Sequence, residues 1–124
     1  MWMIWIKRIG FVLSLCGLAA CTSWEGPRLH VQGTQALERG EYSQARETLS
    51  RAAALVEHPA QASQVENHLG LAYLGEGEEG LAVEAFRRAI DLDCRNEAAK
   101  HNLEIVTGER SEVTGIQTGE SSDE

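Results

Sequence analysis

The sequence predicts an all-α fold, a short solenoid of αα-hairpins followed by a capping helix. Small and apolar residues recur at one constant offset along the chain, as from Gly33 to Gly70. Apolar side chains recur with helical spacing on both sides of two glycine turns, and no segment shows the alternation typical of a strand. Residues 1–20 follow a different pattern, that of a leader.

Residues 1–20 have the layout of a secretory signal peptide. Lys7 and Arg8 form a positive region, and an apolar run over 9–20 ends in small side chains. A helical run of that length rises about 18 Å, which is short of the roughly 30 Å hydrocarbon core of a bilayer. We therefore expect removal rather than a permanent span. The apolar residues 1–6 leave a signal anchor as an alternative, although a charged pair at that depth is costly.

The leader ends in Leu18-Ala19-Ala20-Cys21, an aliphatic residue and two small residues before a cysteine. This segment resembles the lipobox of bacterial lipoproteins, where the thiol receives a diacylglycerol and a peptidase cuts between narrow side chains. The resemblance implies that Cys21 is lipidated and becomes the first mature residue, with no cofactor besides this covalent lipid. Cys16 is a weaker candidate, because the preceding Leu15 is bulky. An ordinary leader with incidental cysteines is the alternative.

A lipidated first residue predicts lasting attachment to a bilayer. Each buried methylene contributes about 0.8 kcal/mol, and the family's cysteine carries several acyl chains. Thr22 stands after the cysteine where an aspartate often signals retention at the inner membrane. The resemblance therefore implies an outer-membrane lipoprotein that faces the periplasm, with residues 21–28 as a tether.

Charge restricts the partners of the mature chain. Removing the leader takes Lys7 and Arg8 from a formal net charge of −8 and leaves −10. We expect no nucleic-acid partner and no electrostatic attraction to an anionic membrane surface. Cys94 has no second cysteine in the mature chain besides Cys21, so we expect no internal disulfide framework.

The histidines are scattered along the sequence and show no metal-binding spacing. They are His30, His58, His68 and His101. A catalytic site needs a base, a nucleophile or a metal cluster in one cleft. The sequence shows none of these patterns, so we expect neither a metal site nor an enzyme.

Two copies of one repeat follow, over residues 29–62 and 63–96. The pairs that match at the constant offset are Gly33/Gly70, Gly40/Gly77, Ala45/Ala82, Leu49/Phe86 and Ala52/Ala89. Once a three-residue insertion around 58–60 is subtracted, the offset equals the length of the copy at 63–96. Apolar stripes with steps of three, four and seven residues flank turns at 39–41 and 75–78, which predicts two antiparallel helix pairs.

The second copy resembles the tetratricopeptide (TPR) repeat. Its length, Leu69-Gly70, Tyr73 and the later small positions match that family, whereas the first copy is degenerate, with Gln32 and Ala36 in place of leucine and tyrosine. TPR arrays bind proteins in a concave groove lined by the first helix of each repeat. The resemblance implies these groove residues: His30, Thr34, Leu37, Asn67, Leu71, Leu74, His101 and Ile105. The leucines favour apolar or helical ligands. The alternative is that two copies are too few for a groove.

Residues 97–108 are expected to form the capping helix. Asn96 can cap its start, Ala99, Leu103 and Val106 share one face, and Gly108 can end it. Residues 109–124 are acidic and rich in serine and glycine, and we expect a disordered tail. Two repeats are marginal for independent stability, so a partner or a homo-oligomer would add stability.

These features together predict a membrane-anchored periplasmic TPR lipoprotein that acts as a protein-protein interaction adaptor. By analogy with small repeat lipoproteins, the partners are expected in a cell-envelope assembly of the pilus or secretion type. Two alternatives stay open: a self-associating structural lipoprotein, and an accessory subunit of a cell-wall enzyme.

Overall fold

The computed structural model describes residues 24–108. The predicted leader, the lipobox with Cys21 and the predicted tail at 109–124 lie outside this range. The described residues form five helices and no strand, which confirms the predicted all-α class. The helices are α2 (Glu25–Glu38), α3 (Tyr42–Leu55), α4 (Pro59–Gly75), α5 (Glu79–Leu92) and α6 (Glu97–Thr107).

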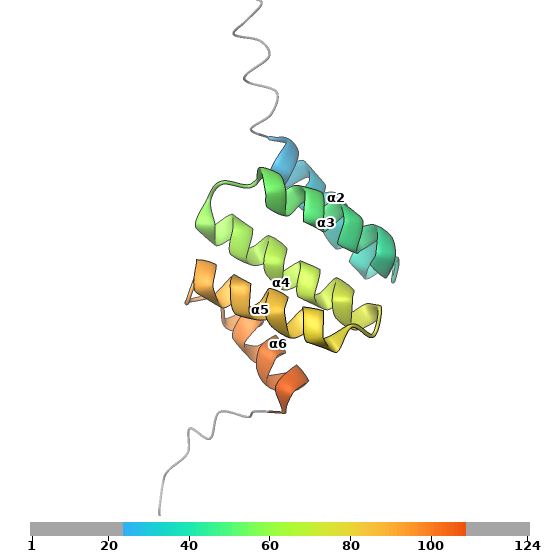
Figure 1. The fold of residues 1–124 in the computed structure, drawn as a ribbon. Helices are drawn as coiled ribbons and strands as arrows, with labels where there is room; N and C mark the ends of the chain where they lie inside the picture. The colour runs from blue at the N-terminus through green and yellow to red at the C-terminus, as the bar shows by residue number, and fades with distance from the viewer. Residues whose placement is uncertain (1–23, 109–124) are drawn as a thin grey trace, which may run out of the picture.

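The helices form two antiparallel hairpins and a final helix. α2 pairs with α3 and α4 pairs with α5, while α3 packs on α4 and α6 packs on α5 (Figure 1). The chain therefore forms the TPR-like hairpin arrangement that the repeat predicts. None of the helices within residues 24–108 combines the length and the apolar character needed to cross a bilayer.

Each hairpin turns on a glycine with a positive φ angle. Gly40 has φ 74°, and the Glu41 N–H donates to the Ala36 carbonyl at 2.9 Å, which satisfies one of the last carbonyls of α2. The second hairpin repeats this arrangement at the equivalent position of its own turn, where Gly77 has φ 80°. A residue with a Cβ atom is disfavoured in this conformation. Glycine therefore allows the chain to reverse direction in both hairpins.

Within each hairpin the two helices approach closely at a second glycine. A Cβ on Gly33 would lie 2.5 Å from Leu49 Cγ, and a Cβ on Gly70 would lie 2.5 Å from Phe86 Cε1. Leu49 and Phe86 are fully buried. The repeat offset thus reproduces one packing contact in both hairpins, with a larger side chain in the second.

Small side chains make up much of the remaining core. The buried alanines are Ala36, Ala45, Ala52, Ala72, Ala82, Ala85, Ala89 and Ala99. Leu29, Val65 and Leu69 are also buried, and Tyr73 is partly buried against the cluster. Helices that meet through alanine and glycine bring their backbones close together, so any enlarged side chain there must displace a neighbour.

The predicted tether at 21–28 is wrong at its described end, because α2 already begins at Glu25. Pro27 lies in the first turn of the helix, where its missing N–H costs no hydrogen bond. Gly26 packs against the start of the next connection, since a Cβ there would lie 2.9 Å from Val56 Cγ2. Helix α2 therefore extends one turn beyond the predicted repeat.

The three-residue insertion around 58–60 does not form a longer loop. α4 has 17 residues where α2, α3 and α5 each have 14, and Pro59 occupies its first turn. The additional residues are absorbed as nearly one more helical turn at the start of α4, ahead of the predicted repeat boundary at Ser63.

Hydrogen bonds from Asn96 hold α6 to the second hairpin. The Asn96 Oδ1 accepts from the Ala99 N–H at 3.0 Å, which caps α6, and its Nδ2 donates to Ser63 Oγ at 2.8 Å. The buried Ser63 hydroxyl in turn donates to the Ala89 carbonyl at 2.7 Å. α6 ends at Gly108, which has φ 68°.

Glu104 stands in α6 where the hairpins have their close-contact glycine. It follows Gly70 by one length of the repeat at 63–96. The first helix of each hairpin has no side chain at this position, whereas α6 carries a long charged one.

Candidate functional site

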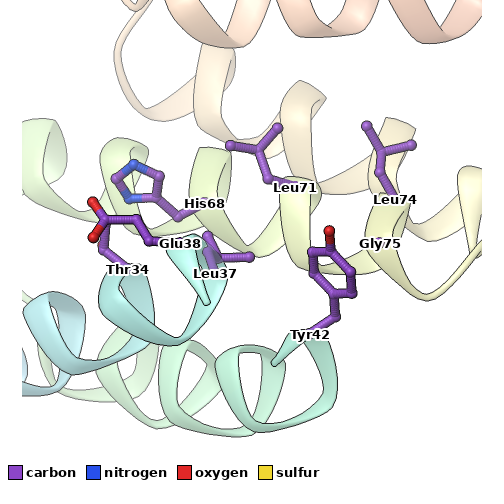
Figure 2. A pocket seen from close by; sticks show the side chains of 8 residues that line it. All are labelled: Thr34, Leu37, Glu38, Tyr42, His68, Leu71, Leu74 and Gly75. Carbon is purple, nitrogen blue, oxygen red and sulfur yellow. The ribbon is translucent and has the colours of Figure 1, made fainter. Parts of the chain in front are cut away.

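An open groove of about 530 Å³ lies between the first helices of the two hairpins. Its lining residues are Thr34, Leu37, Glu38, Tyr42, His68, Leu71, Leu74 and Gly75 (Figure 2). The α2 residues fall three and four positions apart, as do the residues of α4, so helical periodicity turns each set to one face. The opposite face of α2, with Gly33 and Ala36, packs in the core.

The groove brings together four of the residues that the TPR resemblance indicated. Thr34 and Leu37 lie on α2, and Leu71 and Leu74 lie one turn apart on α4. None of the four belongs to the fully buried core, so their side chains remain accessible between the helices. The apolar part of the groove therefore consists of leucines from both repeats.

Four further residues line the groove that the TPR resemblance did not indicate: Glu38, Tyr42, His68 and Gly75. The Tyr42 ring lies so close to Gly75 that no Cβ could stand there. Because Gly75 has no side chain, the ring of Tyr42, the first residue of α3, can pack directly on the end of α4. The sequence gives little indication of this contact, because Tyr42 follows the turn of the first hairpin and Gly75 ends the first helix of the second hairpin.

Two histidines that are far apart in the sequence meet beside the groove. His30 Nε2 and His68 Nδ1 lie 2.7 Å apart, and the ring centroids are 4.9 Å apart. The histidines are scattered along the sequence, but the fold brings this pair together. Their separation of 38 positions, one more than the repeat offset, is the signal that could have found the contact, since equivalent helices lie side by side.

The geometry of this pair limits its charge. A hydrogen bond between the facing nitrogens needs one donor and one acceptor, so both imidazoles cannot be protonated while it is intact. Burial lowers the pKa of His68, and burial together with the charge of His68 lowers the pKa of His30. Both rings are therefore mainly neutral near pH 7. Thr34 Oγ1 donates to the backbone carbonyl of His30, one turn earlier in α2, at 2.9 Å.

Acidification is expected to destabilise the fold through this pair. Because the pKa values are lowered in the folded state, the unfolded chain takes up protons first as the pH falls below about 6.5. The stabilising contribution is complete above that pH and is lost as the pH falls toward the folded pKa values. The Tm should drop by a few degrees between about pH 7 and pH 5.5. Thermal unfolding followed by circular dichroism measures this.

The matched variants are His68→Gln and His101→Gln. The first should flatten the dependence of Tm on pH, and the second, at an exposed position outside the groove, should leave it as in the wild type. Equal pH profiles for His68→Gln and the wild type would contradict the role of the pair.

Asn67 was predicted to line the groove and does not. Its side chain is only 7% exposed, and Oδ1 accepts a hydrogen bond from Asn102 Nδ2 at 2.9 Å. A buried amide without a partner would be costly, and Asn102 of α6 supplies one. Asn67 therefore connects α4 to α6, and the next residue, His68, faces the groove instead.

His101 and Ile105 were also predicted to line the groove, and they lie outside it. Both are exposed on α6, with Ile105 65% exposed. α6 packs on α5 and lies at the opposite end of the stack from α2 (Figure 1). The groove lies between α2 and α4, so it does not reach α6.

The groove carries one formal charge near neutral pH, the carboxylate of Glu38. No lysine or arginine is among the lining residues. Across residues 24–108, no three histidine, cysteine or acidic side chains come close enough together to hold a metal ion. The arrangement suits binding of an extended or helical segment through apolar contacts.

Comparison with known proteins finds distant relatives in marine cyanobacteria. The chain is 25% identical over 88 residues to the photosystem I assembly protein Ycf3 of Prochlorococcus marinus (strain MIT 9303), covering 68% of this chain and 51% of the relative. It is 27% identical over 74 residues to the Ycf3 protein of Parasynechococcus marenigrum (strain WH8102), covering 60% of this chain and 43% of the relative. The chain thus spans about half the length of the curated relatives it matches. No family model matches it, and no solved structure matches it at a significant level.

These relatives correct the predicted location. They are cyanobacterial proteins named for the assembly of photosystem I, and this finding contradicts an outer-membrane lipoprotein that faces the periplasm. Their names give no support to a pilus or secretion assembly. What the relatives and the hairpins support together is a short TPR-like array similar to assembly proteins.

Proposed function

We propose that the chain is a protein-interaction adaptor that binds a segment of a partner protein in the groove between α2 and α4. The groove carries this proposal, because Leu37, Leu71 and Leu74 converge there from two helices and each stays partly exposed. Apolar area left exposed in the groove is unfavourable, and covering it with a ligand contributes about 25 cal/mol for each Å² removed from water. The adaptor works by binding, with no catalytic step and no cofactor.

The relatives favour assembly as the process in which the adaptor acts. Ycf3 proteins are named for the assembly of photosystem I, and the similarity covers most of this chain but about half of theirs. We propose an assembly role on this basis, with the partner to be found by experiment. The groove and the relatives add no support to self-association or to an accessory role beside a cell-wall enzyme. Lipidation of Cys21 stays a prediction.

A photocrosslinking side chain at position 71 tests the adaptor function in intact cells. Leu71 lies in the groove, and position 92 on α5 is the control, because Leu92 is 41% exposed and lies outside the groove. We expect one protein to crosslink at position 71 and not at position 92. Mass spectrometry of the adduct identifies it.

Purified partner then allows a quantitative comparison. Leu71→Asp should raise the Kd by about tenfold or more, as expected for a central apolar contact, while Leu92→Asp should leave it unchanged. Circular dichroism must show that both variants keep their helices. Equal crosslinking at both positions, or equal affinity of the two variants, would rule out the groove as the binding site.

A further inference from the structure

The groove has a polar end and an apolar end. Figure 2 shows Glu38 and His68 beside Thr34 at one end, while Tyr42 lies toward Leu74 and Gly75 at the other. A ligand that fills the groove must therefore meet a carboxylate and apolar side chains along its length.

No ion pair within the described residues neutralises Glu38. The neighbouring Arg39 turns toward Glu41, with its Nη2 lying 2.9 Å from Glu41 Oε2. The charge of Glu38 helps to raise the pKa of Arg39, but less than Glu41 does, and among residues 24–108 no lysine or arginine nitrogen lies within ion-pair distance of the Glu38 carboxylate. Glu38 is also exposed, so a ligand can reach it.

The histidines at the same end do not supply a positive charge near neutral pH. His68 Nδ1 is engaged with His30 Nε2 at 2.7 Å, a contact that cannot hold two protonated rings, and burial lowers the pKa of both histidines. The groove is thus negative at one end, in a chain whose formal net charge is −8. Both the local and the overall charge favour a cationic ligand.

We infer that the groove takes a helical segment of a partner protein that carries a lysine or arginine about one turn from two apolar residues, with the cation set against Glu38. This inference rests on the proposed adaptor function and names the class of its ligand. Leu71 and Leu74 lie three residues apart on α4, and a helix presents apolar side chains with a matching spacing of three or four residues. Tyr42 lies at the apolar end of the groove, and Glu38 at the polar end favours a ligand with a positively charged side chain there.

Two synthetic helical peptides that differ at one position provide the test. Both carry two leucines four residues apart, and one has a lysine a turn before the first leucine where the other has a glutamine. Fluorescence anisotropy with the full chain gives each Kd at about 50 mM and about 500 mM NaCl. We expect the lysine peptide to bind about threefold to fivefold tighter at low salt, with the preference reduced at high salt.

Glu38→Gln should remove the preference for the lysine peptide, so that the ratio of the two Kd values falls to about one whatever the absolute affinity of the variant. The matched control is Glu47→Gln, which neutralises an exposed carboxylate of α3 outside the groove and should retain the preference. Comparing two peptides with two variants isolates the coupling between the lysine and Glu38 from general charge effects.

Equal affinity of the two peptides for the wild type, or an unchanged preference in Glu38→Gln, would overturn the inference. Absence of binding by either peptide would overturn it as well. The adaptor function is judged separately by the crosslink at position 71, so a partner captured there without a basic helix would leave the function standing and reject this ligand class.

Discussion

Replacing Phe86 by alanine is expected to lower the free energy of unfolding by about 3–5 kcal/mol. The side chain is fully buried and is the largest of the fully buried side chains within residues 24–108. It fills the space that Gly70 leaves open, so truncation creates a cavity between α4 and α5 that alanine-rich neighbours cannot fill. Urea unfolding followed by circular dichroism measures the loss as a lower midpoint of the transition.

Leu92→Ala provides the control on the same helix. Leu92 is 41% exposed, and its truncation should cost less than about 1 kcal/mol. Losses of similar size for the two variants would mean that the second hairpin is not packed around Phe86.

Gly70→Ala is expected to lower the free energy of unfolding by about 1–3 kcal/mol. The added Cβ would lie 2.5 Å from Phe86 Cε1 and 2.8 Å from Cζ, so the ring or one of the helices must move. Gly80→Ala makes the same chemical change on α5, where a Cβ meets nothing within 4 Å, and should keep or raise stability. The two Tm values should therefore move in different directions or by clearly different amounts.

A double variant tests whether the cost arises at the ring. Combining Gly70→Ala with Phe86→Leu removes the ring atoms that the new methyl group would meet. The combined loss should be smaller than the sum of the two single losses, as expected for residues in direct contact. Additive losses would show that Gly70→Ala acts elsewhere.

The repeat pattern predicted the contacts that both hairpins share. One offset located the turn glycines Gly40 and Gly77 and placed Gly33 and Gly70 in close helix contacts. These positions are predictable because a backbone with positive φ, or a pair of touching helices, admits almost no other residue. The leucines of the groove followed from the same alignment.

Contacts that do not recur in both repeats could not be predicted in this way. Asn67 occupies a position typical of a groove residue, but Asn102 on the following helix binds its amide. His30 and His68 meet because neighbouring first helices lie side by side, a relation between the copies rather than within one. The start of α2 depends on Gly26 packing against Val56, a contact outside the repeat period. Each of these contacts depends on how separate helices pack together, and the periodicity within one helix does not predict that packing.

The glutamate at position 104 limits how the array could be lengthened. In both hairpins the second helix crosses the first over a bare backbone, where even one methyl group would lie 2.5 Å from a neighbouring side chain. In α6 the side chain of Glu104 occupies the corresponding place. A helix added by protein engineering could therefore not approach α6 as closely as α5 approaches α4 at Gly70. An engineer who wishes to graft a further module onto this end should first exchange residue 104 for glycine and only then design the incoming helix.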